Sequence, residues 1–364
     1  MGVTDWGARD PVRRRPCDNM FSSQAKPYRN HGSCLTEPPR SRPHNNNVAA
    51  STVPGAVASP LGLFYGLANR TILFSRGDYI FVTFGLFAGI AAFVGGIFAS
   101  WLLLAQGVGT VETGALMFGI LVGHLVPARV FLLPWRIQHI RTQPKTVLRT
   151  VEFASWGGFA AIGAGLLLYS WLSSQPLIAL TDVTVRAGVL GHAIGRLGCL
   201  SLGCCYGRPT GLPFGVRYDS EHAKAVRVGG LGGMRIHPVP LYESLYNLGL
   251  FVLLNAIAFA GAPQGIPTAA YLLLYGAGRF ALEGFRDNGA SEMVGPLHRN
   301  QWFSLVMVAS GLGLLAAMAP FDGPHAPALS GGWPGVLTLA PAIAAASVIV
   351  GLVYSLHRGA IGRW

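Results

Sequence analysis

The feature that most constrains this chain is an uncharged apolar run from Tyr79 to Ala105. The run is longer than the ~20 residues that a helix needs to cross the hydrocarbon layer of a membrane. Lipid offers no hydrogen bonds to an open backbone, so such a segment must pair its own N–H and C=O groups as a helix. The run therefore predicts a membrane-spanning helix.

Further apolar runs predict a polytopic protein. They lie at Ala115–Pro134, Phe153–Leu172, Leu241–Ala260, Thr268–Phe285, Trp302–Ala319 and Val336–Leu356, with a more polar one at Leu177–Leu202. Only 12% of the residues are charged, which is low for a soluble domain, and 49 glycines allow helices to approach closely. We predict an all-α fold, a polytopic transmembrane helix bundle with about seven or eight spans.

The formal net charge of +12 does not indicate a nucleic-acid partner. Eight of the 27 Lys and Arg residues lie in the first 42 positions, in a segment rich in Pro, Asn and Ser. This composition is typical of disorder. We therefore divide the chain into a disordered or over-extended N-terminal tail at residues 1–60, a membrane domain at 61–320 and an extra C-terminal hydrophobic segment at 321–364.

Basic residues also give a prediction of orientation. Lys and Arg precede the first apolar run and gather again at residues 136–149, an even number of crossings later. Because these residues collect on cytoplasmic loops, the charge pattern alone places the N-terminus inside.

Ionisable side chains within the apolar runs mark the candidate site, because each is costly at membrane depth. In YGAGRFALEGFR, Tyr275, Arg279, Glu283 and Arg286 follow at i, i+4, i+8 and i+11, which forms one stripe on a helix. One interpretation is an internal Arg279–Glu283 ion pair that only fixes helix packing. The surplus of arginine over glutamate favours an anion site instead.

A glycine-rich segment, GHAIGRLGCLSLGCCYGRPTG, surrounds Arg196, while Arg129 lies late in the second apolar run. Glycines let backbone amides approach a ligand closely and form anion-binding concavities. A guanidinium group in this setting is suited to hold a phosphate in bidentate fashion. Close helix packing is the alternative, which explains the glycines but not the arginine.

The same segment contains Cys199, Cys204 and Cys205. A soft metal ion or a covalent role for Cys204 are two hypotheses. Their C-x4-C-C spacing lacks the paired C-x2-C of a zinc site, and buried cysteines are usually small apolar fillers. The sequence therefore predicts no metal site and no cofactor.

A third polar motif, HPVPLYESLYN, begins at His237 and places Glu243 at the start of an apolar run. Tyr242 with Tyr246, and Glu243 with Asn247, form two i, i+4 pairs. The alternatives are a role in contacting substrate and an aromatic belt at the lipid–water boundary with a helix-start glutamate.

Together these motifs resemble the prolipoprotein diacylglyceryl transferases of bacterial inner membranes. The family signature is matched at Gly195, Arg196, Gly198, Gly203 and Gly207; the His-Pro-x-x-Leu-Tyr-Glu motif at His237, Pro238, Leu241, Tyr242 and Glu243; and the Tyr-Gly-x-x-Arg-x-x-x-Glu-x-x-Arg helix at Tyr275, Gly276, Arg279, Glu283 and Arg286. The resemblance covers roughly residues 82–319, and the combination is more specific than any one motif. It implies an outward-facing N-terminus, against the charge pattern.

Several polar positions of the family differ in this chain. Phe84 stands where the family has Tyr before Gly, and Trp156 where it has His before Gly-Gly. Cys199 and Cys204 replace the Asn and the Glu of the signature. Since the arginines are kept, the resemblance supports lipid binding more strongly than the transfer step.

The resemblance implies an enzyme that moves the diacylglyceryl group of phosphatidylglycerol to the thiol of a prolipoprotein lipobox cysteine. We expect Arg196 and Arg279 to clamp the phosphate, supported by Arg129 and Arg286, with Tyr275 and Gly207 in the lipid-binding site. His237, Glu243 and Glu283 are the candidate bases. The implied partners are phosphatidylglycerol, the prolipoprotein signal peptide and membrane lipids, and the implied location is the bacterial inner membrane, crossed several times.

Three other functions remain as alternatives. The first is a paralogue that uses the same lipid donor on another acceptor, and the second is a non-catalytic lipid-binding membrane protein. An anion transporter is the third, and the absence of internal repeats and of paired broken helices disfavours it.

Overall fold

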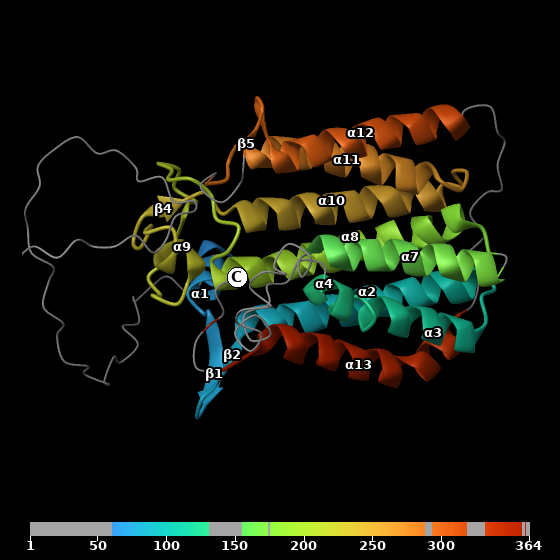
Figure 1. Cartoon of the computed structure of the whole chain (residues 1–364), viewed down its shortest axis with the longest axis horizontal. Coiled ribbons are helices and arrows are strands. Elements are labelled where there is room, and N and C mark those ends of the chain that lie inside the picture. Colours follow the sequence, from blue (N-terminus) through green and yellow to red (C-terminus); the bar gives the residue numbers. More distant parts are fainter. Residues whose placement is uncertain are drawn as a thin grey trace, which may run out of the picture. The chain divides into compact units, whose positions relative to one another are not determined.

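Helices form most of the computed structural model, which describes residues 60–130, 155–173, 175–287, 293–318, 332–358 and 361. All of these residues belong to one compact unit, Val53–Trp364. The eight apolar runs correspond to α2 (Thr83–Ala105), α3 (Thr110–Leu121) with α4 (Leu125–Val130), α7 (Ser155–Ser173), α8 (Leu177–Leu202), α10 (Val239–Phe259), α11 (Ile266–Glu283), α12 (Arg299–Met318) and α13 (Trp333–Ser355). The predicted all-α bundle is confirmed (Figure 1).

Six helices in the described part of the chain are long and apolar enough to cross a membrane, with α3 and α4 counted together as Thr110–Ala128. The apolar part of α7, Gly157–Ser173, is shorter, and α11 is not among the six. These two helices account for the difference from the predicted seven or eight spans. The protein is a multi-pass membrane protein.

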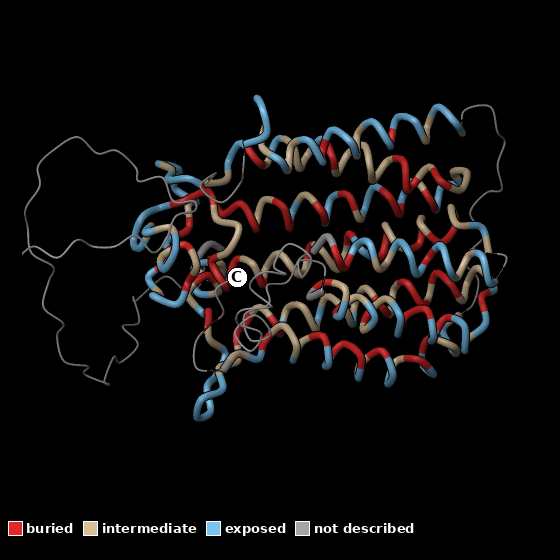
Figure 2. Tube along the Cα trace, viewed as in Figure 1, coloured by how far each residue is buried: buried red, intermediate tan, exposed pale blue. Residues whose placement is uncertain are grey.

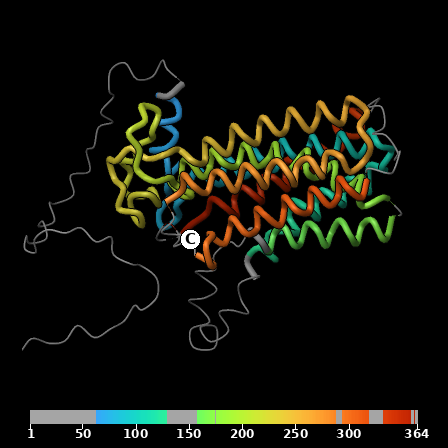
Figure 3. The backbone as a smooth tube through the Cα atoms, turned by 90° about the horizontal axis from the view of Figure 1, so that it is seen from above, coloured from blue at the N-terminus to red at the C-terminus, as the bar shows by residue number. Residues whose placement is uncertain are grey.

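Helix α8 lies at the centre of the bundle, where it packs against α2, α7, α10 and α11. Helix α11 also packs on α10 and α12, and α13 packs on α2 and α3. Figure 3, seen from above, shows that these helices keep a common direction. Two faces of α8 are thus covered by helices from distant parts of the sequence, which can bring polar side chains together.

Large apolar side chains remain exposed along the outer faces of the bundle. Trp171, Leu337 and Val126 are examples, and the side of each helix that faces its neighbours is buried (Figure 2). An apolar outer surface of this kind is expected where lipid replaces water as the solvent.

Short strands, which the sequence prediction missed, lie at one end of the helices (Figure 1). Antiparallel β1 (Ile72–Arg76), β2 (Tyr79–Val82) and β7 (Leu356–Arg358) form a sheet in the order β1-β2-β7. The predicted start of the first span at Tyr79 is therefore wrong. Residues 79–82 pair as a strand, and the helix begins at Thr83.

The same end carries α1 (Pro60–Ala68), α9 (Lys224–Arg227), the pair β3 (Val216–Arg217) and β4 (Arg235–Ile236), and the pair β5 (Met293–Val294) and β6 (Leu297–His298). The connection between α8 and α10 has a small core of its own around Tyr218 and Ile236. The hydroxyl of Tyr218 donates to the carbonyl of Leu200, 2.9 Å away, and so fixes this core to the end of α8.

Helices α2 and α13 approach each other through glycines. A Cβ atom added at Gly85 would collide with the Gly351 carbonyl and with Ser355, and one added at Gly351 would lie in tight contact, 3.1 Å from the Gly85 carbonyl oxygen. The hydroxyl of Ser355 donates to the carbonyl of Val82, 2.7 Å away. The C-terminal helix is therefore packed directly on the first spanning helix.

We predict that Gly85→Ala lowers the free energy of unfolding by about 1–3 kcal/mol, because its methyl group must displace backbone atoms of α13. Thermal unfolding of the protein in detergent, followed by circular dichroism, measures the change. The matched control is Gly163→Ala in α7, where an added Cβ meets no atom within 4 Å. Equal melting temperatures for the two variants would contradict the close α2–α13 contact.

Candidate functional site

The first part of the site joins three helices around Glu243, a carboxylate that is only 1% exposed. Nη2 of Arg196 lies 2.8 Å from its Oε1. The hydroxyl of Tyr275 donates to the same oxygen at 3.2 Å, and Nε of Arg196 donates to Nε2 of His192 at 2.9 Å. Three motifs that are far apart in the sequence, on α8, α10 and α11, thus share one buried ion pair.

The second part of the site surrounds Glu283, which is also 1% exposed. Nη1 of Arg279 donates to its Oε2 at 2.8 Å, and Nη1 of Arg286 lies 3.7 Å from the same oxygen. Nδ2 of Asn300, at the start of α12, donates to Oε1 at 3.2 Å. The Arg279–Glu283 pair of the packing interpretation therefore exists, but a second arginine shares its carboxylate.

The two parts are close enough for their charges to interact. The positive charge of Arg279 attracts the carboxylate of Glu243, and the positive charge of Arg196 repels that of Arg286. Three guanidinium groups and two carboxylates sum to 3 − 2 = +1. A cluster with one surplus positive charge attracts a single negative charge. The charge of the cluster is therefore compatible with the anion site that the excess of arginine predicts.

Gly207 connects the glycine-rich segment to both other motifs. Its N–H donates to the carbonyl of His237 at 3.2 Å, and it forms an isolated β-bridge with Arg286. The N–H of Arg208 donates to the carbonyl of Phe285 at 3.0 Å. An added Cβ at Gly207 would lie 2.5 Å from the carbonyl oxygen of His237, so only glycine fits between these two backbones.

His237 lies at the rim of the site, just before α10. Its Nδ1 is 3.2 Å from the hydroxyl of Tyr242, and its ring packs edge-on against Phe285 at 5.3 Å between centroids. Burial, together with repulsion from Arg208, lowers the pKa of His237, which favours its neutral form.

The three cysteines gather beside Arg196. The sulfur atoms of Cys199, Cys204 and Cys205 all lie within 4.8 Å of one another, close enough to share one metal ion. Nη1 of Arg196 is 3.6 Å from Sγ of Cys205 and 3.9 Å from Sγ of Cys199. The cluster is therefore part of the candidate site and not a separate feature.

The structure thus brings together eight of the nine predicted residues: Arg196, Glu243, Tyr275, Arg279, Glu283, Arg286, Gly207 and His237. Arg129 is in α4, and its side chain, like that of Trp156, lies outside the described residues. Asn300 was missed. Its signal in the sequence is an amide side chain next to Arg299, at the start of an apolar run.

A second polar cluster, also missed, lies near the opposite end of α8. Nε and Nη2 of Arg186 donate to Oδ1 of Asn255 at 3.0 and 2.7 Å, and its guanidinium lies over the ring of Phe259. The carboxylate of Asp182 accepts the backbone N–H groups of Gly265 and Thr268. Arg186 carried the same signal as Arg196, an arginine in an apolar run, but its partners are consistent with helix packing.

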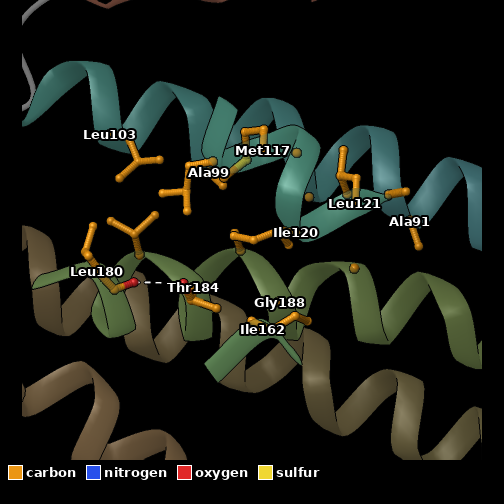
Figure 4. Close-up of a pocket in the computed structure, with 17 residues that line it drawn as sticks. Ala91, Ala99, Leu103, Met117, Ile120, Leu121, Ile162, Leu180, Thr184 and Gly188 are labelled. Carbon is orange, nitrogen blue, oxygen red and sulfur yellow. Dashed lines mark hydrogen bonds between the residues drawn. The ribbon is translucent and has the colours of Figure 1, made fainter. Parts of the chain in front are cut away.

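An apolar pocket of about 150 Å³ lies between α2, α3, α7 and α8. Figure 4 shows Leu103, Ala99 and Met117 on one side and Leu180, Thr184 and Ile162 on the other. Its lining extends along α8 to Gly191, one residue before His192, which contacts Arg196. The polar site and the apolar pocket therefore follow each other along the same helix.

We predict that Glu283→Gln lowers the free energy of unfolding by about 3 kcal/mol or more, because two guanidinium groups lose their buried counter-charge while the shape is kept. Chemical denaturation in mixed micelles measures the loss. Glu221→Gln is the matched control, since that side chain is 84% exposed and pairs only loosely with His222. A loss no larger than the control's would show that the Glu283 cluster is not held by charge.

Comparisons with known proteins identify the family of this chain. The sequence model of the prolipoprotein diacylglyceryl transferase family matches residues 71–317. The phosphatidylglycerol–prolipoprotein diacylglyceryl transferase of Nostoc sp. is 30% identical over 273 residues, 71% of this chain and 93% of the relative. Enzymes of the same name from Gloeobacter violaceus and Synechococcus elongatus are 34% and 31% identical, over 54% and 64% of this chain and 73% and 82% of their own lengths. This chain belongs to the prolipoprotein diacylglyceryl transferase family.

Proposed function

We propose that this chain transfers the diacylglyceryl group of phosphatidylglycerol to the thiol of a prolipoprotein lipobox cysteine, in the inner membrane of a bacterium. The names of its relatives support this reaction. The observation that carries the proposal is the cluster of three partly buried arginines and two buried glutamates. Family membership and the charge of this cluster point to the same substrate class.

The charge of the cluster suits the donor lipid. Phosphatidylglycerol has one phosphodiester group with one negative charge, which matches the surplus of one positive charge at the site. When the glyceryl carbon–oxygen bond breaks, further negative charge develops on the phosphate. Preorganised guanidinium groups in a low-dielectric site stabilise that charge strongly.

The three arginines have different tasks in this proposal. Arg279 and Arg286 share one carboxylate, and their side chains remain 13% and 18% exposed, so they keep N–H donors for the phosphate. Arg196 divides its nitrogen atoms among Glu243, His192 and the cysteine sulfur atoms. Arg196 therefore links the phosphate site to the glycine-rich segment.

The carboxylates position the arginines. Glu243 and Glu283 each accept from guanidinium groups and from one neutral donor, Tyr275 or Asn300. A carboxylate held in this way is a weak proton acceptor. Of the three candidate bases, His237 keeps the neutral ring that proton transfer needs.

The apolar pocket suits a segment of one acyl chain of the donor, because its volume of about 150 Å³ is smaller than that of a pocket for a whole drug-sized ligand. It is lined almost entirely by aliphatic side chains and glycines and lies along α8 from the polar cluster. A phosphate held by Arg279 and Arg286 and an acyl chain directed along α8 would place the glyceryl group between them. This arrangement is that of an amphipathic lipid, with a charged head and an apolar body.

The departures from the family pattern favour a second candidate, a lipid-binding protein that does not transfer the group. Phe84, Cys199 and Cys204 lack the polar groups that the family resemblance implies at those positions. This candidate shares the donor site with the first and differs from it only in the acceptor step.

Complementation tests the proposed transfer. We expect the chain, expressed in cells depleted of their own transferase, to restore the diacylated form of a reporter prolipoprotein. Failure to restore it, with the protein confirmed in the membrane, would reject the transfer and leave the lipid-binding candidate. Binding of phosphatidylglycerol to the purified protein then tests that candidate.

We predict that Arg279→Ala and Arg196→Ala each lower the transfer rate by at least ~100-fold, because each removes a group that stabilises developing charge. Release of glycerol phosphate from labelled phosphatidylglycerol in proteoliposomes is the measurement. Arg235→Ala, at the exposed residue of strand β4, serves as the arginine control. Full activity of both site variants would refute the phosphate clamp.

A further inference from the structure

We infer that Cys199, Cys204 and Cys205 bind one Zn²⁺ ion, whose fourth coordination position accepts and deprotonates the acceptor thiol. The inference deepens the proposed function and rests on it for the identity of that thiol. It assigns a role to Cys199 and Cys204, which replace polar groups of the family pattern, and it makes the acceptor thiol more acidic, so that a weak base such as His237 suffices.

The positions of the sulfur atoms suit a metal. Zinc–sulfur bonds of ~2.3 Å in a tetrahedral site place the sulfur atoms roughly 3.8 Å apart. The three sulfur atoms lie within 4.8 Å of one another, so shifts of about 1 Å or less complete the geometry. Soft thiolate ligands select soft cations, of which Zn²⁺ forms such sites without redox chemistry.

The backbone holds this geometry at a conformational cost. Helix α8 ends at Gly203, which is left-handed with φ of 65°, and the N–H of Cys204 then donates to the carbonyl of Cys199 at 3.2 Å. Cys205 has φ of 57°, and among the described residues it is the one non-glycine with positive φ. Such a conformation is strained for a residue with a side chain and is typical of functional sites.

The turn after α8 explains how cysteines with C-x4-C-C spacing can converge. A C-x4-C-C sequence does not offer the paired ligands of a common zinc motif. The left-handed residues at 203 and 205 reverse the chain after α8, so that Cys204 and Cys205 face back toward Cys199. Cysteines that only fill apolar space would not need to bring three thiols together beside the guanidinium group of Arg196.

Arg196 fits the electrostatics of the site. Three thiolates and one Zn²⁺ carry a net charge of −3 + 2 = −1 beside Arg196, while Arg279 and Arg286 with Glu283 keep a surplus of 2 − 1 = +1 for the phosphate. Nη1 of Arg196 is within 3.6 Å of Cys205 Sγ and 3.9 Å of Cys199 Sγ, so its N–H groups can donate to ligand sulfur atoms. Donors of this kind orient metal ligands and tune the metal.

The proposed step is a thiol alkylation. Three protein ligands leave the fourth position open, as in catalytic zinc sites, and a thiol that coordinates zinc there loses its proton. The bound thiolate attacks the glyceryl carbon that carries the phosphate. One sulfur–carbon bond forms, one carbon–oxygen bond breaks, and the electron pair leaves on glycerol phosphate, which can take up the released proton. The neutral thioether then binds zinc weakly and dissociates.

The metal content of the full-length protein is the first test. We expect one zinc per chain when protein purified in detergent from zinc-supplemented cells is measured by plasma mass spectrometry. Cobalt-substituted protein should show a sulfur-to-metal charge-transfer band in the near ultraviolet. Protein without stoichiometric zinc overturns the inference, and so does a disulfide among the three cysteines, detected as resistance to alkylation before reduction.

Cysteine variants assign the ligands. Cys199→Ser, Cys204→Ser and Cys205→Ser should each lower bound zinc at least fivefold, while Cys34→Ser, the cysteine control from the N-terminal segment, should keep it. Gel filtration identifies any variant that fails to fold. Where a variant fails to fold, the wild-type protein from which a phenanthroline chelator has removed the zinc is measured in its place. Full zinc occupancy in all three serine variants overturns the site.

Activity separates this inference from the proposed function. Chelation should lower the rate of thiol transfer at least tenfold, and added Zn²⁺ should restore it. Loss of a residue that only hydrogen-bonds to a metal ligand lowers activity roughly 10–100-fold, so loss of the metal itself should cost at least as much. Transfer that is unaffected by complete zinc removal overturns the zinc mechanism and leaves the transferase function intact. Stoichiometric zinc in a protein without transfer activity has the opposite meaning: the metal site stands and the proposed function fails.

Discussion

The pairing of partly buried arginines with buried glutamates is the constraint on which the rest of this structure depends. A charge at membrane depth is costly, so each guanidinium group needs a counter-charge within reach. Glu243 and Glu283 provide it from α10 and α11. Tyr275 donates to the same oxygen of Glu243 as Arg196 does, and Asn300 donates to the second oxygen of Glu283. The positions of α8, α10, α11 and α12 relative to one another are fixed by these contacts as much as by apolar packing.

The bundle could be predicted from the sequence because apolar runs in a membrane protein have few alternatives to the helix. The limits of Leu177–Leu202 agree with α8 to the residue. The start at Tyr79 did not, because strand pairing with β1 and β7 depends on residues far away in the sequence. Short strands of two to five residues carry too little pattern to be recognised locally.

The site was predictable in its members but not in its pairing. Each arginine within an apolar run was a candidate by cost alone, and the motifs supplied the order. The sequence could not say that Arg196 pairs with Glu243 while Arg279 and Arg286 share Glu283, since those choices depend on how α8, α10 and α11 are rotated. The convergence of the three cysteines depends on left-handed backbone at Gly203 and Cys205, which no spacing rule encodes.

The sheet that joins the start of the membrane domain to the C-terminal hydrophobic segment has a consequence for assembly. β2 directly precedes the first spanning helix, and its second hydrogen-bonding edge is completed by β7, which directly follows α13. During synthesis one edge of the β1–β2 hairpin therefore stays unpaired until α13 and β7 have been made. Such long-range pairing forms late in folding. The sheet is completed only when α13 is in place, so a chain that lacks α13 keeps an unpaired edge on β2, which can pair with another chain.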